Sequence, residues 1–156
     1  MTTGSTTSGY DIEYTHTVAA APDRVFAAFT DADLFARWYG PPGFPVPRDE
    51  VEIDPRPDGV YRFAMVGEAD PSMRAPFDGK VTDVVPGSML AVDGAWQGIP
   101  GTDGPWASGL RVELTPEDGG TRVVVREGPH PAGTAEFGRQ AWAMMLPKLE
   151  AAVATA

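Results

Sequence analysis

The sequence contains no cysteine and no asparagine. Without a thiol there is no cysteine nucleophile, thiolate metal site or disulfide. Without asparagine there is no N-glycosylation sequon. No apolar run approaches the roughly 18 residues that a membrane-spanning helix needs, and the first residues lack the basic and apolar regions of a signal peptide. We therefore expect a cytoplasmic protein that does not insert into a membrane.

Basic residues are also scarce. Lysine and arginine together number 12, against 22 aspartate and glutamate residues, so the formal charge is −10. An acidic chain repels the phosphate backbone, which argues against a nucleic-acid partner. With two histidines and no paired-histidine spacing, a metal site is not expected. The sequence has no nucleophile elbow and no glycine-rich phosphate loop that opens a helix, so we expect no cofactor.

The pattern along the 156 residues fits one domain. Residues 1–9 are polar and small, which predicts a disordered tail, and residues 10–156 form the domain. Alternating polar and apolar residues predict a strand over 10–18, and Pro22 and Asp31 mark the starts of two short helices. Further strands are expected near 48–54, 59–67, 75–84, 88–96, 107–115 and 121–128, with a long loop over 93–109. Helical spacing predicts a long helix over 134–154, kinked at Pro147.

This order predicts an α+β fold in which about seven antiparallel strands form one curved sheet. Such a sheet must bury one face, and the long C-terminal helix is the one element that can cover it. A sheet that grips a helix, with two short helices closing one end, leaves space between the two layers. A pocket there would be largely apolar, with a few polar groups.

The chain resembles the START-like superfamily, also called SRPBCC or helix-grip. Within it, the chain is most similar to single-domain members of the Aha-type family, named after an activator of a heat-shock chaperone ATPase. The matching stretches are 21–31, 34–41, 54–62, 79–86, 120–123 and the helix positions Trp142, Leu146 and Leu149. One departure is Pro57-Asp58-Gly59, where the family usually has paired glycines. The resemblance implies the helix-grip fold; relatives with this fold include polyketide cyclases, aromatases and lipid carriers, so function has to be argued from the site.

Three residues are candidate acid–base groups. Tyr14 and His16 share the face of the first strand that would point into the cavity. Glu127 has the same parity as Val123 and Val125 on the last strand, and burial would raise its pKa and suit it to acid–base work. The first and last strands pair in this fold, so Glu127 is expected near Tyr14 and His16. The alternative is that Tyr14 and His16 belong to the core or rim and that Glu127 is solvated.

A second set of candidates would contact a ligand. Aromatic walls favour flat apolar molecules, although the same residues can simply form the core. Trp96 and Trp106 flank a loop and are candidates for a lid, whereas His130 lies between two prolines and is expected to be exposed, with a catalytic or gating role as the alternative. The full set of ligand-binding candidates is Trp38, Tyr61, Phe63, Phe77, Trp96, Trp106, His130, Phe137, Ala141 and Met145.

The sequence therefore supports three functions of different kinds. The first is a cofactor-independent enzyme of the polyketide cyclase or dehydratase type that acts on a small hydrophobic molecule. The second is a non-catalytic carrier of a lipid or other small molecule. The third is an interaction module such as a chaperone regulator, which would need an exposed patch that the sequence does not mark. A homodimer through exposed strand edges or loops is compatible with each.

Overall fold

The computed structural model describes residues 10–98, 105–131 and 133–155. Seven strands form one antiparallel sheet in the order β1-β7-β6-β5-β4-β3-β2, so every neighbouring pair except β1 and β7 is consecutive in sequence. The strands are β1 (Ile12–Val18), β2 (Glu52–Ile53), β3 (Val60–Val66), β4 (Arg74–Val85), β5 (Met89–Trp96), β6 (Trp106–Glu117) and β7 (Gly120–Gly128). The helices are α2 (Pro22–Thr30), α3 (Ala32–Trp38), the short 3₁₀ helix η1 (Arg48–Glu50) and α4 (Ala135–Thr155).

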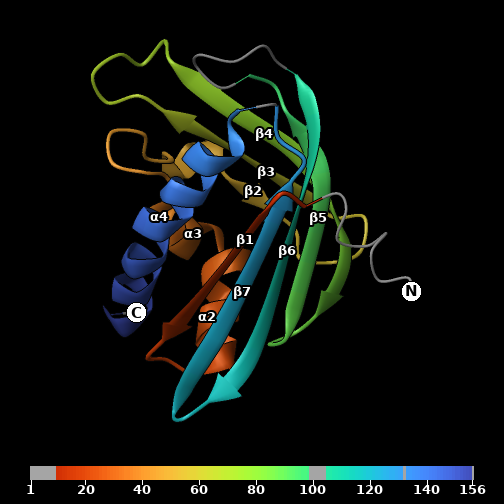
Figure 1. Ribbon diagram of the computed structural model, residues 1–156, viewed down its shortest axis with the longest axis vertical. Helices are drawn as coiled ribbons and strands as arrows, with labels where there is room; N and C mark the ends of the chain where they lie inside the picture. The colour runs from red at the N-terminus through yellow and green to blue at the C-terminus, as the bar shows by residue number, and fades with distance from the viewer. Residues whose placement is uncertain (1–9, 99–104, 132, 156) are drawn as a thin grey trace.

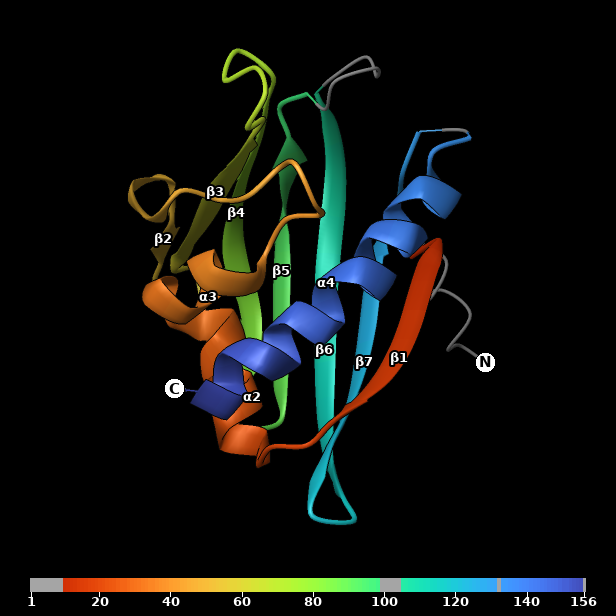
Figure 2. The ribbon, with the colours of Figure 1, turned by 90° about the vertical axis from the view of Figure 1, so that its left-hand side faces the viewer.

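The helices lie on one face of the sheet. Figure 1 shows the strongly curved sheet wrapping around them, and Figure 2 shows α4 crossing in front of β6 and β7, with α2 and α3 filling the other side of the concave face. This is the expected α+β helix-grip architecture, with two short helices after the first strand and a long C-terminal helix.

Aromatic side chains with polar tips join the two short helices to each other and to the sheet. Asp31 caps α3 by accepting from the backbone N–H groups of Asp33 and Leu34, as expected from its position. The buried indole of Trp38 donates to the backbone oxygen of Ala28 over 2.8 Å. The buried hydroxyl of Tyr61, on β3, donates to the backbone oxygen of Phe29 over 2.7 Å. These bonds satisfy polar groups inside the core and hold α2 and α3 in place.

The long helix has the predicted apolar face. Trp142, Leu146, Leu149 and Val153 are all buried in the hydrophobic core, as their spacing predicts. Pro147 lies inside α4 and is exposed, so its ring points away from the sheet and the helix continues through it from Ala135 to Thr155.

The departure at residues 57–59 changes only a turn. Asp58 takes a positive φ of 67°, a conformation that aspartate tolerates better than most residues. At Gly59, an added Cβ would lie 2.1 Å from the backbone oxygen of Asp54, so this position needs glycine. The remaining glycine of the pair is thus the one that the close backbone approach requires.

Two local predictions are wrong. The segment predicted as a strand over 48–54 forms η1 followed by the two-residue strand β2. The predicted loop over 93–109 is shorter, because β5 continues to Trp96 and β6 already begins at Trp106. Glycine and proline residues suggested a loop there, but cross-strand pairing extends the hairpin. The predicted disordered tail, residues 1–9, lies outside the described residues.

Candidate functional site

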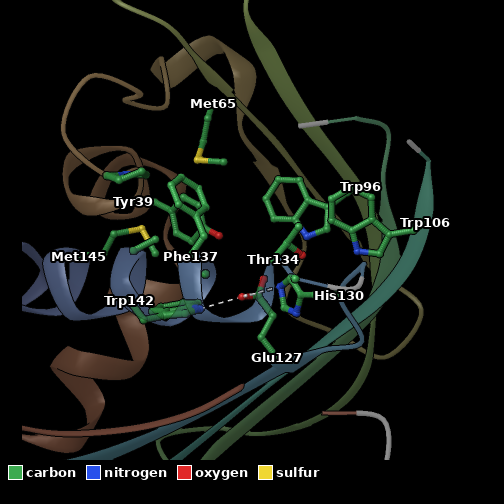
Figure 3. Close-up of a pocket in the computed structure, with 14 residues that line it drawn as sticks. Tyr39, Met65, Trp96, Trp106, Glu127, His130, Thr134, Phe137, Trp142 and Met145 are labelled. Carbon is green, nitrogen blue, oxygen red and sulfur yellow. Dashed lines mark hydrogen bonds and ion pairs between the residues drawn. The ribbon is translucent and has the colours of Figure 1, made fainter. Parts of the chain in front are cut away.

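A cavity of about 280 Å³ opens between the N-terminal half of α4 and the sheet. Most of its wall is apolar, and the polar groups gather on one side (Figure 3). The described residues that line it are Tyr39, Pro41, Met65, Trp96, Trp106, Glu127, His130, Gly133, Thr134, Phe137, Gly138, Ala141, Trp142 and Met145.

The carboxyl group of Glu127 is the buried acid of this cavity. Along β7, Val123, Val125 and Glu127 are buried, as the alternation predicts, whereas Arg122 points outward. Glu127 lies opposite Ile12 on β1 and Leu110 on β6, so apolar neighbours flank it in the sheet. The solvated alternative for Glu127 does not hold, because the residue is only 8% exposed.

Burial raises the pKa of Glu127, and the nearby charge of Asp11 raises it further. The charge of His130 and the hydrogen bond from Trp142 act in the opposite direction. The indole Nε1 of Trp142 donates to Oε1 of Glu127 over 2.8 Å. The net effect is a raised pKa, which favours the neutral acid in the folded protein.

His130 connects this acid to the protein surface. Its side chain is 7% exposed, so the preferred expectation of an exposed loop residue is wrong. The carboxyl group of Asp11 accepts a hydrogen bond from the backbone N–H of His130 over 2.9 Å. Its other oxygen lies 2.8 Å from the ring Nδ1 of His130 and is hydrogen-bonded to it. The other ring nitrogen, Nε2, lies 3.7 Å from Oε1 of Glu127. The side chain of Asp11 is 38% exposed, so Asp11, His130 and Glu127 form a chain of titratable groups from solvent to cavity.

The helix passes close to this arrangement at Gly138. A Cβ at Gly138 would lie 2.7 Å from Cδ1 of Ile12 and 3.5 Å from Nε2 of His130. A side chain here would press on the two residues that flank Glu127. Glycine costs about 1 kcal/mol in a helix interior relative to alanine, and close packing of α4 offsets that cost here.

Aromatic side chains form most of the remaining wall. Tyr39 is buried, and burial together with the charge of Glu127 raises the pKa of its hydroxyl well above the ordinary value. Trp96 and Trp106 stand together on the opposite wall, with ring centroids 6.4 Å apart. Phe137 lines the cavity yet is 65% exposed, which places it at the mouth.

The structure brings six of the ten ligand-contact candidates to the cavity. They are Trp96, Trp106, His130, Phe137, Ala141 and Met145. The other four, Trp38, Tyr61, Phe63 and Phe77, are buried in the hydrophobic core and do not line the cavity. Their rings pack against one another and against Phe35 and Tyr39, so they support the wall from behind.

Tyr14 and His16 do not lie at the cavity with Glu127. Both are on the inward face of β1, as predicted, but they stand opposite Val125 and Val123, further along the strand. There α4 covers β1: Nε2 of His16 lies 3.5 Å from Oε1 of Glu150. Glu150 also accepts from the backbone N–H of Ala19. His16 therefore meets the C-terminal half of the helix, while Glu127 meets its N-terminal half.

Several residues of the site were not selected from the sequence, and Asp11, Tyr39 and Trp142 are the most informative of them. Asp11 is one of the polar residues in the alternating segment that predicts the first strand, and Trp142 lies in the helical spacing that predicts the apolar face of the long helix. Trp142 belongs to both the core and the site, because it packs on Trp38 and also lines the cavity. Tyr39 follows α3 directly and carried no signal of its own beyond being aromatic. The contact between Glu127 and Trp142 can be recognised only once the position of α4 on the sheet is known.

Within residues 10–98, 105–131 and 133–155, no three His, Cys, Asp or Glu side chains are grouped so that they could hold a metal ion. No helix in these ranges is both long and apolar enough to cross a membrane.

Comparison with known structures shows that the fold is shared widely. A protein of Chromobacterium violaceum is 26% identical, with a TM-score of 0.80, and the match covers 91% of this chain and 95% of that one. The AHSA1 protein of Silicibacter pomeroyi is 24% identical, with a TM-score of 0.77 and coverage of 92% and 97%. DynU16, from the dynemicin biosynthetic locus, is 19% identical, with a TM-score of 0.68, but the match covers 92% of this chain and only 47% of DynU16.

No curated protein sequence matches the chain. The model of one protein family does match, over residues 19–154, which is nearly the whole domain. These residues run from the end of β1 through α4 and include all the lining residues of the cavity. The chain therefore belongs to the family of activator of Hsp90 ATPase homolog 1-like proteins.

Proposed function

We propose that this protein binds a small hydrophobic, aromatic molecule in the cavity and acts on it without a cofactor, with Glu127 as the general acid. The observation that carries the proposal is the buried carboxyl group with a raised pKa at the edge of an apolar cavity. Burial of an acid is costly unless the neutral form is used, and perturbed acids in pockets are frequent at catalytic sites.

The size of the cavity limits the ligand. Pockets for small molecules span roughly 300–1,000 Å³, and this one, at about 280 Å³, lies just below that range. A molecule of one or two fused rings fits this volume better than a sterol or a long acyl chain. The flat walls of Trp96, Trp106 and Tyr39 favour ring systems by contact area and stacking.

The proposed reaction is a dehydration in which Glu127 is the general acid. Neutral Glu127 gives its proton to a hydroxyl group of the ligand, the carbon–oxygen bond breaks, and water leaves. The resulting carboxylate takes a proton from the neighbouring carbon, which forms the double bond and restores the acid. Glu127 must be protonated before each turnover. His130, which is hydrogen-bonded to Asp11, would pass protons between Glu127 and solvent to restore that protonation state.

A carrier without catalysis is the second candidate. The mostly apolar wall favours it, because such a cavity holds a hydrophobic molecule whether or not chemistry follows. In a carrier, Glu127 would donate a hydrogen bond to the ligand without transferring its proton.

The first experiment measures the thermal midpoint with bicyclic ketones, bicyclic hydrocarbons, fatty acids and sterols. A ligand at 100 times its dissociation constant adds about 2.7 kcal/mol of stability, which is a rise of several degrees at about 2–4 °C per kcal/mol. We expect a rise with the bicyclic compounds. No rise with any class, for a folded protein free of co-purified ligand, would contradict the proposal and favour a protein-interaction role.

The second experiment separates enzyme from carrier. A bicyclic β-hydroxy ketone (hydroxytetralone) is incubated with the protein, and the formation of naphthol is followed by mass spectrometry. In the enzyme, Glu127→Gln abolishes turnover and keeps binding, whereas Glu136→Gln, which changes an exposed carboxyl group outside the cavity, leaves both unchanged. Binding without turnover in the unmodified protein would identify a carrier.

A further inference from the structure

Two indole N–H groups at the cavity have no acceptor in the described part of the chain. The Nε1 atoms of Trp96 and Trp106 are buried, and neither has a hydrogen-bond partner there. Trp96 as a whole is 3% exposed. The other two tryptophans differ: Trp38 donates to Ala28, and Trp142 donates to Glu127. Buried tryptophan N–H groups usually have a partner, so two open donors in one cavity need an explanation.

The two donors lie on the same wall. Trp96 ends β5 and Trp106 begins β6, and they face each other in the register of the hairpin. Their rings are tilted by 32° with centroids 6.4 Å apart. Figure 3 shows the two rings side by side with their nitrogen atoms on the edge toward His130, across the cavity from Met65 and Met145. One polar group of a ligand at that edge can therefore face both donors.

A third buried polar group without a partner in the ranges that the structure describes lies further along the same strand. Ser108 follows Trp106 by two residues on β6 and so lies on the same face of the strand. Its buried hydroxyl also lacks a partner among the described residues, and Ser108 is 5% exposed. Ser108 is not among the described residues that line the cavity, so the open donors at the cavity wall itself are the two indole N–H groups.

We infer that the ligand carries a neutral acceptor oxygen, such as the carbonyl of an aromatic ketone, and that Trp96 and Trp106 hold this oxygen through their indole N–H groups. This inference rests on the proposed function and names its substrate class. A neutral carbonyl is favoured over a carboxylate because no arginine or lysine is among the residues that line the cavity in the described ranges. A cationic ligand is excluded at this wall because it would face donors.

The arrangement also explains how the cavity would select its ligand. A pure hydrocarbon fills the space but leaves both N–H groups unpaired and shut away from water. A site built to bond one oxygen discriminates against the analogue that lacks it, because its own polar groups are left unsatisfied. In the dehydration proposed above, the same donors would hold the carbonyl oxygen, and so orient the ligand, while Glu127 acts on the hydroxyl group.

Tetralone and tetralin test the inference, because they share a ring skeleton and differ in one carbonyl oxygen. Their dissociation constants are measured by NMR titration of the ¹⁵N-labelled full chain. We expect tetralone to bind at least about tenfold more tightly, as one good hydrogen bond predicts. The indole N–H signals of Trp96 and Trp106 should move downfield with tetralone and not with tetralin, and the signal of Trp38 should stay in place.

Two variants assign the effect. Trp96→Phe and Trp106→Phe keep an aromatic ring and remove the N–H, and each should reduce the preference for tetralone severalfold while tetralin affinity changes little. Met65→Leu alters the wall without removing a donor and should leave the preference unchanged. If a phenylalanine variant does not fold, benzothienylalanine at the same position keeps the shape of tryptophan and replaces the N–H by sulfur.

The outcomes separate the two proposals. Equal binding of both compounds, or indole signals that do not move, overturns the acceptor-oxygen inference and leaves the proposed apolar ligand site in place. If neither compound binds, both the inference and the proposed function are wrong. A preference for tetralone that survives loss of both N–H groups also overturns the inference, since the oxygen must then be held elsewhere.

Discussion

The indole N–H of Trp142 on α4 donates a 2.8 Å hydrogen bond to Oε1 of Glu127 on β7. This bond joins the helix to the sheet inside the cavity. It fixes the direction of a carboxyl group that otherwise meets mainly apolar neighbours. Trp142 and Glu127 are therefore coupled. A substitution of Trp142 should change both the free energy of unfolding and the pKa of Glu127.

Replacing Trp142 by phenylalanine should raise the pKa of Glu127 further, because the hydrogen bond from Trp142 lowers it in the native protein. The variant also loses buried aromatic surface and leaves the carboxyl oxygen short of a donor, so we expect a loss of about 2–4 kcal/mol in the free energy of unfolding. Carboxyl ¹³C chemical shifts of Glu127 against pH, together with denaturant unfolding, measure both effects. An unchanged titration would show that the bond does not form in solution.

Stability should depend on pH through Glu127 with a defined sign. Its pKa is raised above the ordinary value of 4.5, so the folded state holds the proton more strongly than the unfolded state. The stabilising contribution of Glu127 is therefore full below pH 4.5 and is lost as the pH rises through the folded pKa. The difference in unfolding free energy between the native protein and Glu127→Gln should fall over that interval. A difference that does not change with pH would contradict the raised pKa.

The two histidines offer a matched pair of variants. His130→Gln removes a charge that lowers the pKa of Glu127, so this pKa should rise. His16→Gln should leave it unchanged, because His16 faces Glu150 at the other half of α4. The same carboxyl titration by NMR measures both. Equal effects of the two substitutions would refute the separate placement of His130 beside the cavity.

Tyr61→Phe should destabilise the fold without affecting the ligand. The change removes the buried bond to the backbone oxygen of Phe29 and leaves that oxygen unpaired, at a cost of about 1–3 kcal/mol. Tetralone binding to the folded variant should stay unchanged, because Tyr61 does not line the cavity. Tyr14→Phe is the control: its hydroxyl has no hydrogen bond among the described residues, and its stability should stay near that of the native protein.

The fold could be predicted from the sequence because its signals are local and repeated. Alternation placed β1 and β7 and gave the correct inward face, including Glu127 beside Val125. Helical spacing gave α4, and Pro22 and Asp31 marked two helix starts. The strand predicted over 48–54 failed because Val51 and Ile53 are the only apolar residues of that charged segment, and so short an alternation does not fix a strand.

The site could be predicted only in part, because it depends on the register in which β1 pairs with β7. The parity of Tyr14, His16 and Glu127 was right, but their register separates them: Glu127 pairs with Ile12, four residues before His16. Parity repeats every two residues, so it fixes a face and leaves the position along the strand open. The approach of Trp142 to Glu127 needs the placement of α4 on the sheet, which no local pattern contains.

The two halves of α4 have different roles. Its first three turns present Phe137, Ala141 and Trp142 to the cavity, whereas Leu149 and Val153 near its end are buried in the core. Substitutions in the first half can thus change what is bound while the second half keeps the domain folded. Specificity can therefore be altered at Phe137 and Ala141, which lie outside the core cluster, with less risk to the fold than at Trp142, which belongs to it.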